Sequence, residues 1–292
     1  MRTLTGYLGR LNPGDFDQYI RLGASSANRR VTMKWHQETY AEVRQRYGFS
    51  ATLGSPLLTA PADNMKLDKS SVPAYGITLQ HYVQKLSDGL TINACPNAGD
   101  CTKACVLDNG NGRYDAVQRA RRAKTEFLAY HPLSFAFLLG RELALAVRRD
   151  GGIFLRPNVN SDVEWETIAP ALCNGETFGQ SITLYGYTKM RKVLDTDGWL
   201  GRSYRVAYSL SEKDGPFDMV RVVDFLARGG SVAQVTNRKP KQPVAEVRGA
   251  TRMDADLTDE WIFGSGVIGD LSAKGKARQL IGVSEFVNTR LY

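Results

Sequence analysis

The chain has little cysteine and no long hydrophobic run, and each absence excludes a class of protein. Four cysteines among 292 residues are too few for a disulfide scaffold, and a chain this long can bury a core without such cross-links. No run of about eighteen apolar residues occurs, so we expect no membrane-spanning helix and no membrane partner. The start of the chain lacks the apolar stretch of a secretory signal. We therefore expect a cytoplasmic location, where thiols are free, metal-bound or catalytic.

Histidine is also sparse. The three histidines, His36, His81 and His131, form no pair in the sequence, which argues against nuclease sites built on paired histidines. The absence of a G-x-S-x-G motif argues against a hydrolase nucleophile elbow. Lys and Arg outnumber Asp and Glu by 38 to 30, for a net charge of +8. This excess favours a polyanionic partner, either a nucleotide or a nucleic acid.

Three of the four cysteines are concentrated in one glycine-containing loop. Cys95, Cys101 and Cys105 have the spacing C-x5-C-x3-C, which lacks the C-x2-C pairs of zinc knuckles and has no histidine nearby. Three free thiols in one exposed loop would oxidise easily, so we interpret them as metal ligands. A thiolate-only set favours an iron–sulfur cluster or, alternatively, zinc. Cys173 could supply a fourth ligand, although its place in an apolar helix favours a buried, inert thiol.

Alternating strands and helices from residue 76 onward predict an α/β fold. Strands are expected at 89–94, 153–159, 181–187, 204–210, 231–237 and within 260–269. Helices are expected between them at 114–131, 133–152, 163–172, 190–195 and 217–230. This alternation indicates right-handed βαβ units in a parallel sheet. About six units fit a parallel partial (β/α)6-like barrel better than a complete eightfold barrel, with a doubly wound open sheet as the competing arrangement.

The first part of the chain has a different pattern. Residues 1–75 are rich in turn-forming segments and are expected to form an irregular N-terminal extension or lid with one helix at 36–49. Residues 76–292 are expected to form the α/β partial barrel that carries the cysteine loop.

Polar side chains follow the predicted strands at the points where the strands end. The carboxyl ends of parallel strands meet at one edge, where active sites of such folds gather. We assign three catalytic candidates to this edge: Asp162, Lys189 and Glu212. Four further candidates for binding a cofactor are Arg156, Asn158, Tyr187 and Ser209. The alternative for Asp162 is that it only caps the helix predicted at 163–172.

A basic helix is expected at 114–131, and it could follow a phosphate backbone or form an ordinary solvated face. Helical spacing places Arg119 and Arg122 on one face and Arg121 and Lys124 on the neighbouring face, all pointing away from the core. A second basic stretch, "NRKPKQP" at 237–243, is expected to be a loop because of its two prolines.

Several short motifs together resemble a phage family. The blocks "CPNAGDCTKAC", "SDVEWE", "YGYTK", "SLSE" and "AKGKAR" are similar to phage-encoded proteins related to phage gene product 88, over about residues 60–280. The resemblance implies a phage protein acting in the host cytoplasm and implies no particular reaction. A looser similarity is to radical S-adenosylmethionine enzymes, in which a three-cysteine loop after the first barrel strand holds a four-iron, four-sulfur cluster. That family has C-x3-C-x2-C, a spacing absent here.

These observations lead to two functional hypotheses. The first is a phage metalloprotein, an iron–sulfur enzyme similar to the radical S-adenosylmethionine type, acting on a nucleotide or nucleic acid. The second is a non-catalytic nucleic-acid-binding protein with a structural zinc site.

Overall fold

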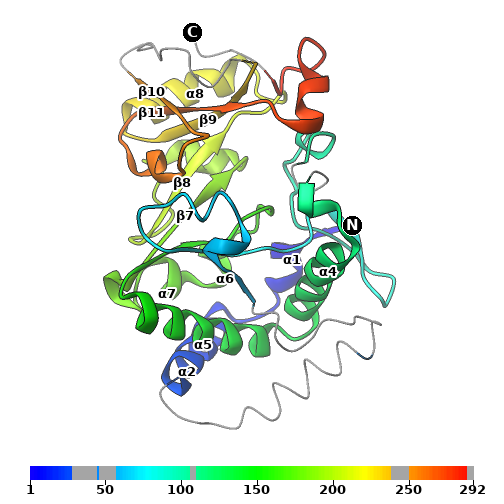
Figure 1. The fold of residues 1–292 in the computed structure, drawn as a ribbon, viewed down its shortest axis with the longest axis vertical. Helices are drawn as coiled ribbons and strands as arrows, with labels where there is room; N and C mark the ends of the chain where they lie inside the picture. The colour runs from blue at the N-terminus through cyan, green and yellow to red at the C-terminus, as the bar shows by residue number, and fades with distance from the viewer. Residues whose placement is uncertain (28–44, 46–56, 106–109, 238–249, 288–292) are drawn as a thin grey trace.

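The main structural unit is an eight-stranded sheet. The computed structural model describes residues 1–27, 45, 57–105, 110–237 and 250–287 (Figure 1). The strand order is β10-β11-β9-β8-β7-β6-β3-β2. All neighbours pair in parallel except β2 and β3. The strands are β2 (Leu58–Thr59), β3 (Ala74–Ile77), β6 (Ile153–Arg156), β7 (Ile182–Thr188), β8 (Tyr204–Ser209), β9 (Ser231–Thr236), β10 (Thr251–Asp254) and β11 (Val267–Ser272).

The α/β class is therefore confirmed, but the barrel is not. From β3 to β9 the strands follow chain order across the sheet, as expected for βαβ units wound in one direction. The end strands β10 and β2 do not pair with each other, so the described residues form an open sheet and no closed barrel. On one side the sheet ends at the two-residue strand β2, which is antiparallel to β3. On the other side β11 lies between β9 and β10, so the strands no longer follow chain order there.

Most predicted helices are present, with one interruption. The long helices are α4 (Asp115–Tyr130), α5 (Pro132–Asp150) and α8 (Pro216–Ala227). The helix predicted at 163–172 is split into α6 (Trp165–Ile168) and α7 (Pro170–Cys173), because Pro170 has no N–H to continue the first segment. The described residues also contain short 3-10 helices: η1 (Pro61–Asp63), η2 (Asp100–Thr102), η4 (Gly110–Arg113), η5 (Gly179–Ser181), η6 (Arg191–Asp195), η7 (Glu260–Phe263) and η8 (Gly275–Leu280).

The N-terminal residues form two helices that the sequence pattern did not predict. These are α1 (Leu4–Leu8) and α2 (Pro13–Ser26). Helix α2 lies directly against α5 at the end of the molecule opposite α8 (Figure 1). Their backbones approach so closely that a Cβ on Gly140 would lie 2.0 Å from the carbonyl oxygen of Ile20.

The N-terminal residues are part of the main body. A small sheet joins β1 (Arg2–Thr3) to β5 (Thr91–Asn93) and β4 (Val83–Lys85). The strand predicted at 89–94 is therefore β5, which belongs to this small sheet, and β3 is the first parallel strand of the main sheet. The expected boundary at residue 75 falls inside β3, and the helix predicted at 36–49 lies, apart from Gln45, outside the described residues.

The two faces of the main sheet have different coverings. Alternate strand residues such as Leu155 and Leu184 belong to the large core shared with the helices, since successive side chains of a strand point to opposite faces. Tyr185 belongs to a second cluster with Trp261 and Ile262 of η7. None of the described helices is long and apolar enough to cross a membrane.

Candidate functional site

The cysteine loop begins against the segment that follows β6. The backbone N–H of Asp162 donates to Ala94 O at 2.7 Å, and the Cys95 thiol donates to Asn160 O at 3.4 Å. The loop thus lies at the carboxyl edge of the main sheet, as predicted, although it leaves a strand of the small sheet. Hydrogen bonds to the segment after β6 hold it there.

Glu212 connects the same loop to the segment after β8. Its Oε1 accepts the backbone N–H of Asp100 at 2.9 Å, next to Cys101 in η2. A Cβ on Gly99 would lie 1.7 Å from that oxygen, so the close approach requires glycine. Burial raises the pKa of the Cys101 thiol, Lys189 lowers it, and Glu212 and Asp162 raise it further. The three catalytic candidates thus all lie near one thiol.

Asp162 is a buried carboxylate at the junction of two strand ends. Its Oδ1 accepts the Thr188 hydroxyl at 2.8 Å, and its Oδ2 accepts the Lys189 backbone N–H at 3.1 Å. Burial raises the pKa of Asp162 to about 6, although both hydrogen bonds oppose the shift. The capping interpretation is wrong, because the residue at the N-cap of α6 is Glu164, with no side-chain cap.

Lys189 projects from the end of β7 toward the end of β8. Its Nζ donates to Ser209 O at 3.2 Å, Ser209 Oγ at 3.1 Å and Leu210 O at 2.8 Å. Burial lowers the pKa of Lys189, while the thiol of Cys101 and nearby carboxylates act in the opposite direction. Ser209, a predicted cofactor-binding residue, therefore orients this lysine.

A C-terminal segment covers the lysine. The ring centroid of Phe286 lies 5.3 Å from Lys189 Nζ, and Ser284 Oγ donates to Asp100 Oδ2 at 2.5 Å. Phe286 also packs with Ala104 of the cysteine loop. Residues far apart in the sequence thus close the site on one side and limit the access of water to Lys189.

Tyr82 is a site residue that the sequence pattern did not reveal. It is the one non-glycine residue with positive φ in the described part of the chain, at 55°, a conformation unfavourable for a bulky side chain. Its backbone N–H lies near the Cys95 thiol and lowers the pKa of that thiol, and its carbonyl accepts the N–H of Ala94 at 2.9 Å. The strained backbone therefore holds the first cysteine in place.

The three loop thiols form a suitable donor set for a sulfur-preferring metal, but not a preformed site. Burial raises the pKa of Cys95 to about 12, and the charges of Asp162, Cys101 and Cys105 add to the shift. The thiols are thus close enough to influence one another. No group of three or more His, Cys, Asp and Glu side chains in the described ranges is already arranged to hold a metal. Metal binding would require these side chains to rotate and lose their protons.

Cys173 has other surroundings. It is buried in α7, and the carboxylates that influence its pKa, besides burial itself, are those of Glu166 and Asp17. It packs in the large helix-covered core. The interpretation as an inert buried thiol therefore fits the structure better than a fourth loop ligand.

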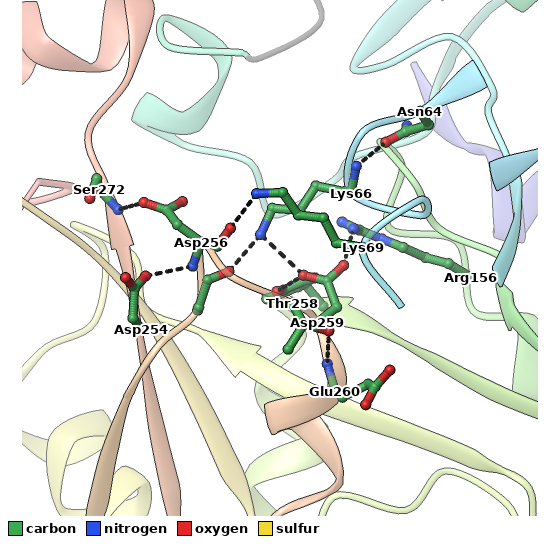
Figure 2. A network of polar contacts seen from close by, with 12 residues as sticks. Asn64, Lys66, Lys69, Arg156, Asp254, Asp256, Thr258, Asp259, Glu260 and Ser272 are labelled. Atoms are coloured by element: carbon green, nitrogen blue, oxygen red, sulfur yellow. Dashed lines mark hydrogen bonds and ion pairs between the residues drawn. The ribbon is translucent and has the colours of Figure 1, made fainter. Parts of the chain in front are cut away.

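Two predicted cofactor-binding residues, Arg156 and Tyr187, belong to a second polar network, in which Figure 2 shows Arg156 beside Asp259. Arg156 Nη1 donates to Asp259 Oδ2 at 2.7 Å, and the Tyr187 hydroxyl donates to Asp259 Oδ1 at 2.7 Å. Lys66 Nζ reaches the same Oδ1 at 3.2 Å, and Lys69 Nζ donates to Asp256 O at 2.7 Å. The arginine also lies over the ring of Tyr187, 4.8 Å from its centroid. Both residues therefore hold Asp259, in the segment before η7, which Lys66 also contacts.

Asn158 also has a structural environment. Its Oδ1 accepts hydrogen bonds from Ser161 Oγ, the Val163 N–H and Trp165 Nε1, at 2.9, 3.1 and 3.1 Å. Its Nδ2 donates to Val163 O at 2.8 Å. The side chain is 3% exposed, so it shapes the turn that presents Asp162 and has no free polar atom for a cofactor.

The basic helix α4 only partly matches its prediction. Arg119 and Arg122 are exposed. Arg121 is buried and donates to Gly112 O at 3.2 Å, and buried Lys124 donates to Leu57 O at 3.2 Å. The prediction of outward-pointing side chains is therefore wrong for these two, because the helix is covered on more sides than its apolar stripe indicates. The basic stretch at 237–243 lies, apart from Asn237, outside the described residues.

Comparison with known proteins identifies a family for this chain. No curated protein and no solved structure matched the chain. The profile of the family described as gene product 88 matches residues 52–280, which is more than half of the chain and includes the cysteine loop, Asp162, Lys189 and Glu212. Together with the motifs that resemble the phage proteins, this match shows that the chain belongs to the phage gene product 88 family.

Proposed function

We propose that this protein is a phage metalloenzyme in which Cys95, Cys101 and Cys105 hold an iron–sulfur cluster. Asp162, Lys189 and Glu212 act beside it on a nucleotide or nucleic acid. The observation that carries the proposal is the convergence of three strand-end segments on one cysteine loop. A purely structural metal loop would not require a buried lysine and a buried carboxylate with shifted pKa values next to it, whereas active sites commonly contain such groups.

The protein residues have distinct roles in this proposal. The lowered pKa of Lys189 makes loss of its proton easier, and its ammonium form can bind an anionic group. Asp162, with its raised pKa, accepts a proton at neutral pH. A bound cluster would supply electron transfer or a Lewis-acidic iron. Glu212 holds the loop against the site through the Asp100 N–H.

The iron–sulfur cluster is the only cofactor that we propose. The spacing C-x5-C-x3-C and the open sheet both differ from the radical S-adenosylmethionine pattern, so we propose the four-iron, four-sulfur cluster without that cosubstrate. The six-unit partial barrel, which rests on the alternation of strands and helices in the sequence, stays a prediction. We also propose that the protein acts in the host cytoplasm, as expected for a phage protein without a secretory signal or membrane-spanning run in its sequence.

Anaerobic purification followed by iron, sulfide and zinc analysis tests the metal. We expect about four irons per chain, lost when Cys95, Cys101 or Cys105 is replaced by alanine. The matched control is Cys173→Ala, which removes a buried thiol outside the loop and should leave the iron content unchanged. One zinc per chain without iron or sulfide would overturn the iron–sulfur proposal.

The alternative, a nucleic-acid-binding protein with structural zinc, is supported by one observation. Arg119 and Arg122 are exposed on the same face of α4, as a phosphate-binding helix requires. Replacing both by glutamine should then reduce the salt dependence of DNA or RNA binding by roughly 1–2 units on the log–log scale, near 0.9 per lost contact. An unchanged slope would make this face an ordinary solvated surface.

A further inference from the structure

A polar pocket lies between β4 and α4. Its volume is about 400 Å³, within the range of roughly 300–1,000 Å³ typical of small-molecule sites. Gln84 and Lys85 come from β4, Gln80 from the segment before it, and Arg122 and Glu126 from successive turns of α4. None of these residues belongs to the groups that surround Lys189.

The inner part of the pocket carries unmatched hydrogen-bond acceptors. Gln80, Gln84 and Glu126 are only 8%, 6% and 4% exposed. Each has one side-chain oxygen with no hydrogen-bond partner among the described residues. The contact between Gln84 Nε2 and Glu126 Oε1 is long, at 3.4 Å. The backbone of Ser87 lies near the carboxylate but makes no bond of normal geometry. Buried acceptors without donors are costly, and these three oxygens are covered from solvent in this structure. A ligand that presents N–H groups would satisfy them once the lining side chains turn toward it.

The outer part of the pocket is basic. Arg122 and Lys85 are exposed and line the same pocket as the buried acceptors. Asp88, also exposed, is the acidic group that influences Glu126 from the adjoining turn. A free amine or guanidinium would be attracted by Glu126 and repelled by the two cations. A ligand with N–H donors at one end and an anionic group at the other satisfies both parts of the pocket.

The pocket and the cysteine loop share one segment of chain. The Gln80 N–H donates to Thr125 Oγ1 of α4 at 2.7 Å, which holds the segment against the helix. Two residues later Tyr82, in its strained conformation, accepts the N–H of Ala94 and has its own N–H near the Cys95 thiol. A molecule that presses on Gln80 or Gln84 therefore contacts the same short turn that positions the first cysteine.

We propose that this pocket binds a nucleotide whose base carries an exocyclic amino group, with the base against Gln80, Gln84 and Glu126 and the phosphate at Arg122 and Lys85. The inference deepens the proposed function and rests on its nucleotide partner. Adenine and cytosine place an amino donor where the pocket has acceptors. Hypoxanthine and uracil place a carbonyl oxygen there, which leaves the buried oxygens unmatched, and sites of this kind discriminate strongly against such analogues.

Calorimetric titration with AMP and IMP tests the base, because the two nucleotides differ at the amino position. We expect AMP to bind at least tenfold more tightly than IMP, and CMP more tightly than UMP. Arg122→Gln should weaken AMP binding about tenfold and leave adenosine binding unchanged. Arg119→Gln is the matched control, one turn away on the same face and outside the pocket, and should bind AMP like the unaltered protein.

Equal binding of AMP and IMP, no binding of either, or equal effects of the two arginine substitutions would overturn the inference. Binding only to longer single strands would also overturn it, in favour of a nucleic-acid surface. Glu126→Gln provides a second variant, with circular dichroism to verify folding. Metal content measured on the same samples separates the two proposals: normal iron without AMP selectivity refutes only this pocket, and AMP selectivity without iron refutes only the metal site.

Discussion

Glu212 Oε1 lies 2.9 Å from the backbone nitrogen of Asp100, at a position that a Cβ on Gly99 would occupy. One carboxylate therefore sets the distance between the end of β8 and the cysteine loop. The contact is possible because position 99 has no side chain, and it gives the first prediction.

Replacing Gly99 by alanine should displace either the cysteine loop or Glu212, because the new Cβ would lie 1.7 Å from Oε1. Overpacking of this kind costs about 1–3 kcal/mol of unfolding free energy. We also expect reduced metal content. Denaturant unfolding and metal analysis measure the two effects. The control is Gly215→Ala, where a Cβ meets nothing within 4 Å; if both variants behave alike, the contact has no influence on the loop.

Asp162 should make stability depend on pH in an unusual direction. Its pKa is raised from 3.8 to about 6, so between these values the folded protein binds a proton that the unfolded chain releases. Stability from this group is therefore present at low pH and lost as pH rises through about 4 to 6. A shift of about two units corresponds to about 3 kcal/mol.

The variant Asp162→Asn cannot titrate and tests this expectation. Placing its amide beside the Lys189 N–H changes the unfolding free energy by an amount that does not depend on pH. The unfolding free energy of the unaltered protein minus that of the variant should fall by up to about 3 kcal/mol between pH 4 and pH 7. Metal-free protein should be used for both. A difference that is flat or rises with pH would show that Asp162 is not buried as described.

Asp259 should be important for stability rather than for chemistry. Burial would raise the pKa of its carboxyl, but Arg156 and Lys66 outweigh this and lower it, so the group is ionised. Asp259→Asn leaves these two cations without their shared partner and should cost about 3–5 kcal/mol. Metal content of the folded fraction should not change.

The control for Asp259→Asn is a substitution in an exposed ion pair. The side chains of Arg221 and Asp195 are 24% and 70% exposed, so Asp195→Asn should cost less than about 1 kcal/mol. Thermal and urea unfolding of the two variants provide the measurement. Loss of metal without loss of stability in Asp259→Asn would instead connect the second network to the cysteine loop.

Two substitutions at Tyr82 separate its backbone from its side chain. Glycine adopts a φ of 55° readily and retains the N–H, whereas proline has φ near −65° and no N–H. We expect Tyr82→Gly to retain metal and to change stability by about 1 kcal/mol or less. Tyr82→Pro should lose metal, as measured by iron and zinc content. Equal loss in both variants would assign the role to the aromatic side chain of Tyr82, a residue that is 44% exposed.

The sequence by itself determined the regular parts of this protein. Apolar periodicity and flanking glycine or proline were sufficient to predict α4, α5, β6, β7, β8 and β9, because these signals are local. The same pattern placed Asp162, Lys189 and Glu212 after three parallel strands, and parallel strands present their carboxyl ends at one edge. The motif blocks also indicated the gene product 88 family.

Only the tertiary structure decided which side chains meet. Arg156 lies at the end of β6, and Tyr187 lies near the end of β7, two residues before Lys189. Both nevertheless pair with Asp259, more than 70 residues further along the chain. A local pattern cannot show such a partner. The burial of Arg121 and Lys124, the strained turn at Tyr82 and the covering of Lys189 by Phe286 likewise depend on contacts between distant segments. Hydrophobic periodicity predicts which residues avoid water, but it does not specify which distant polar group satisfies a buried charge.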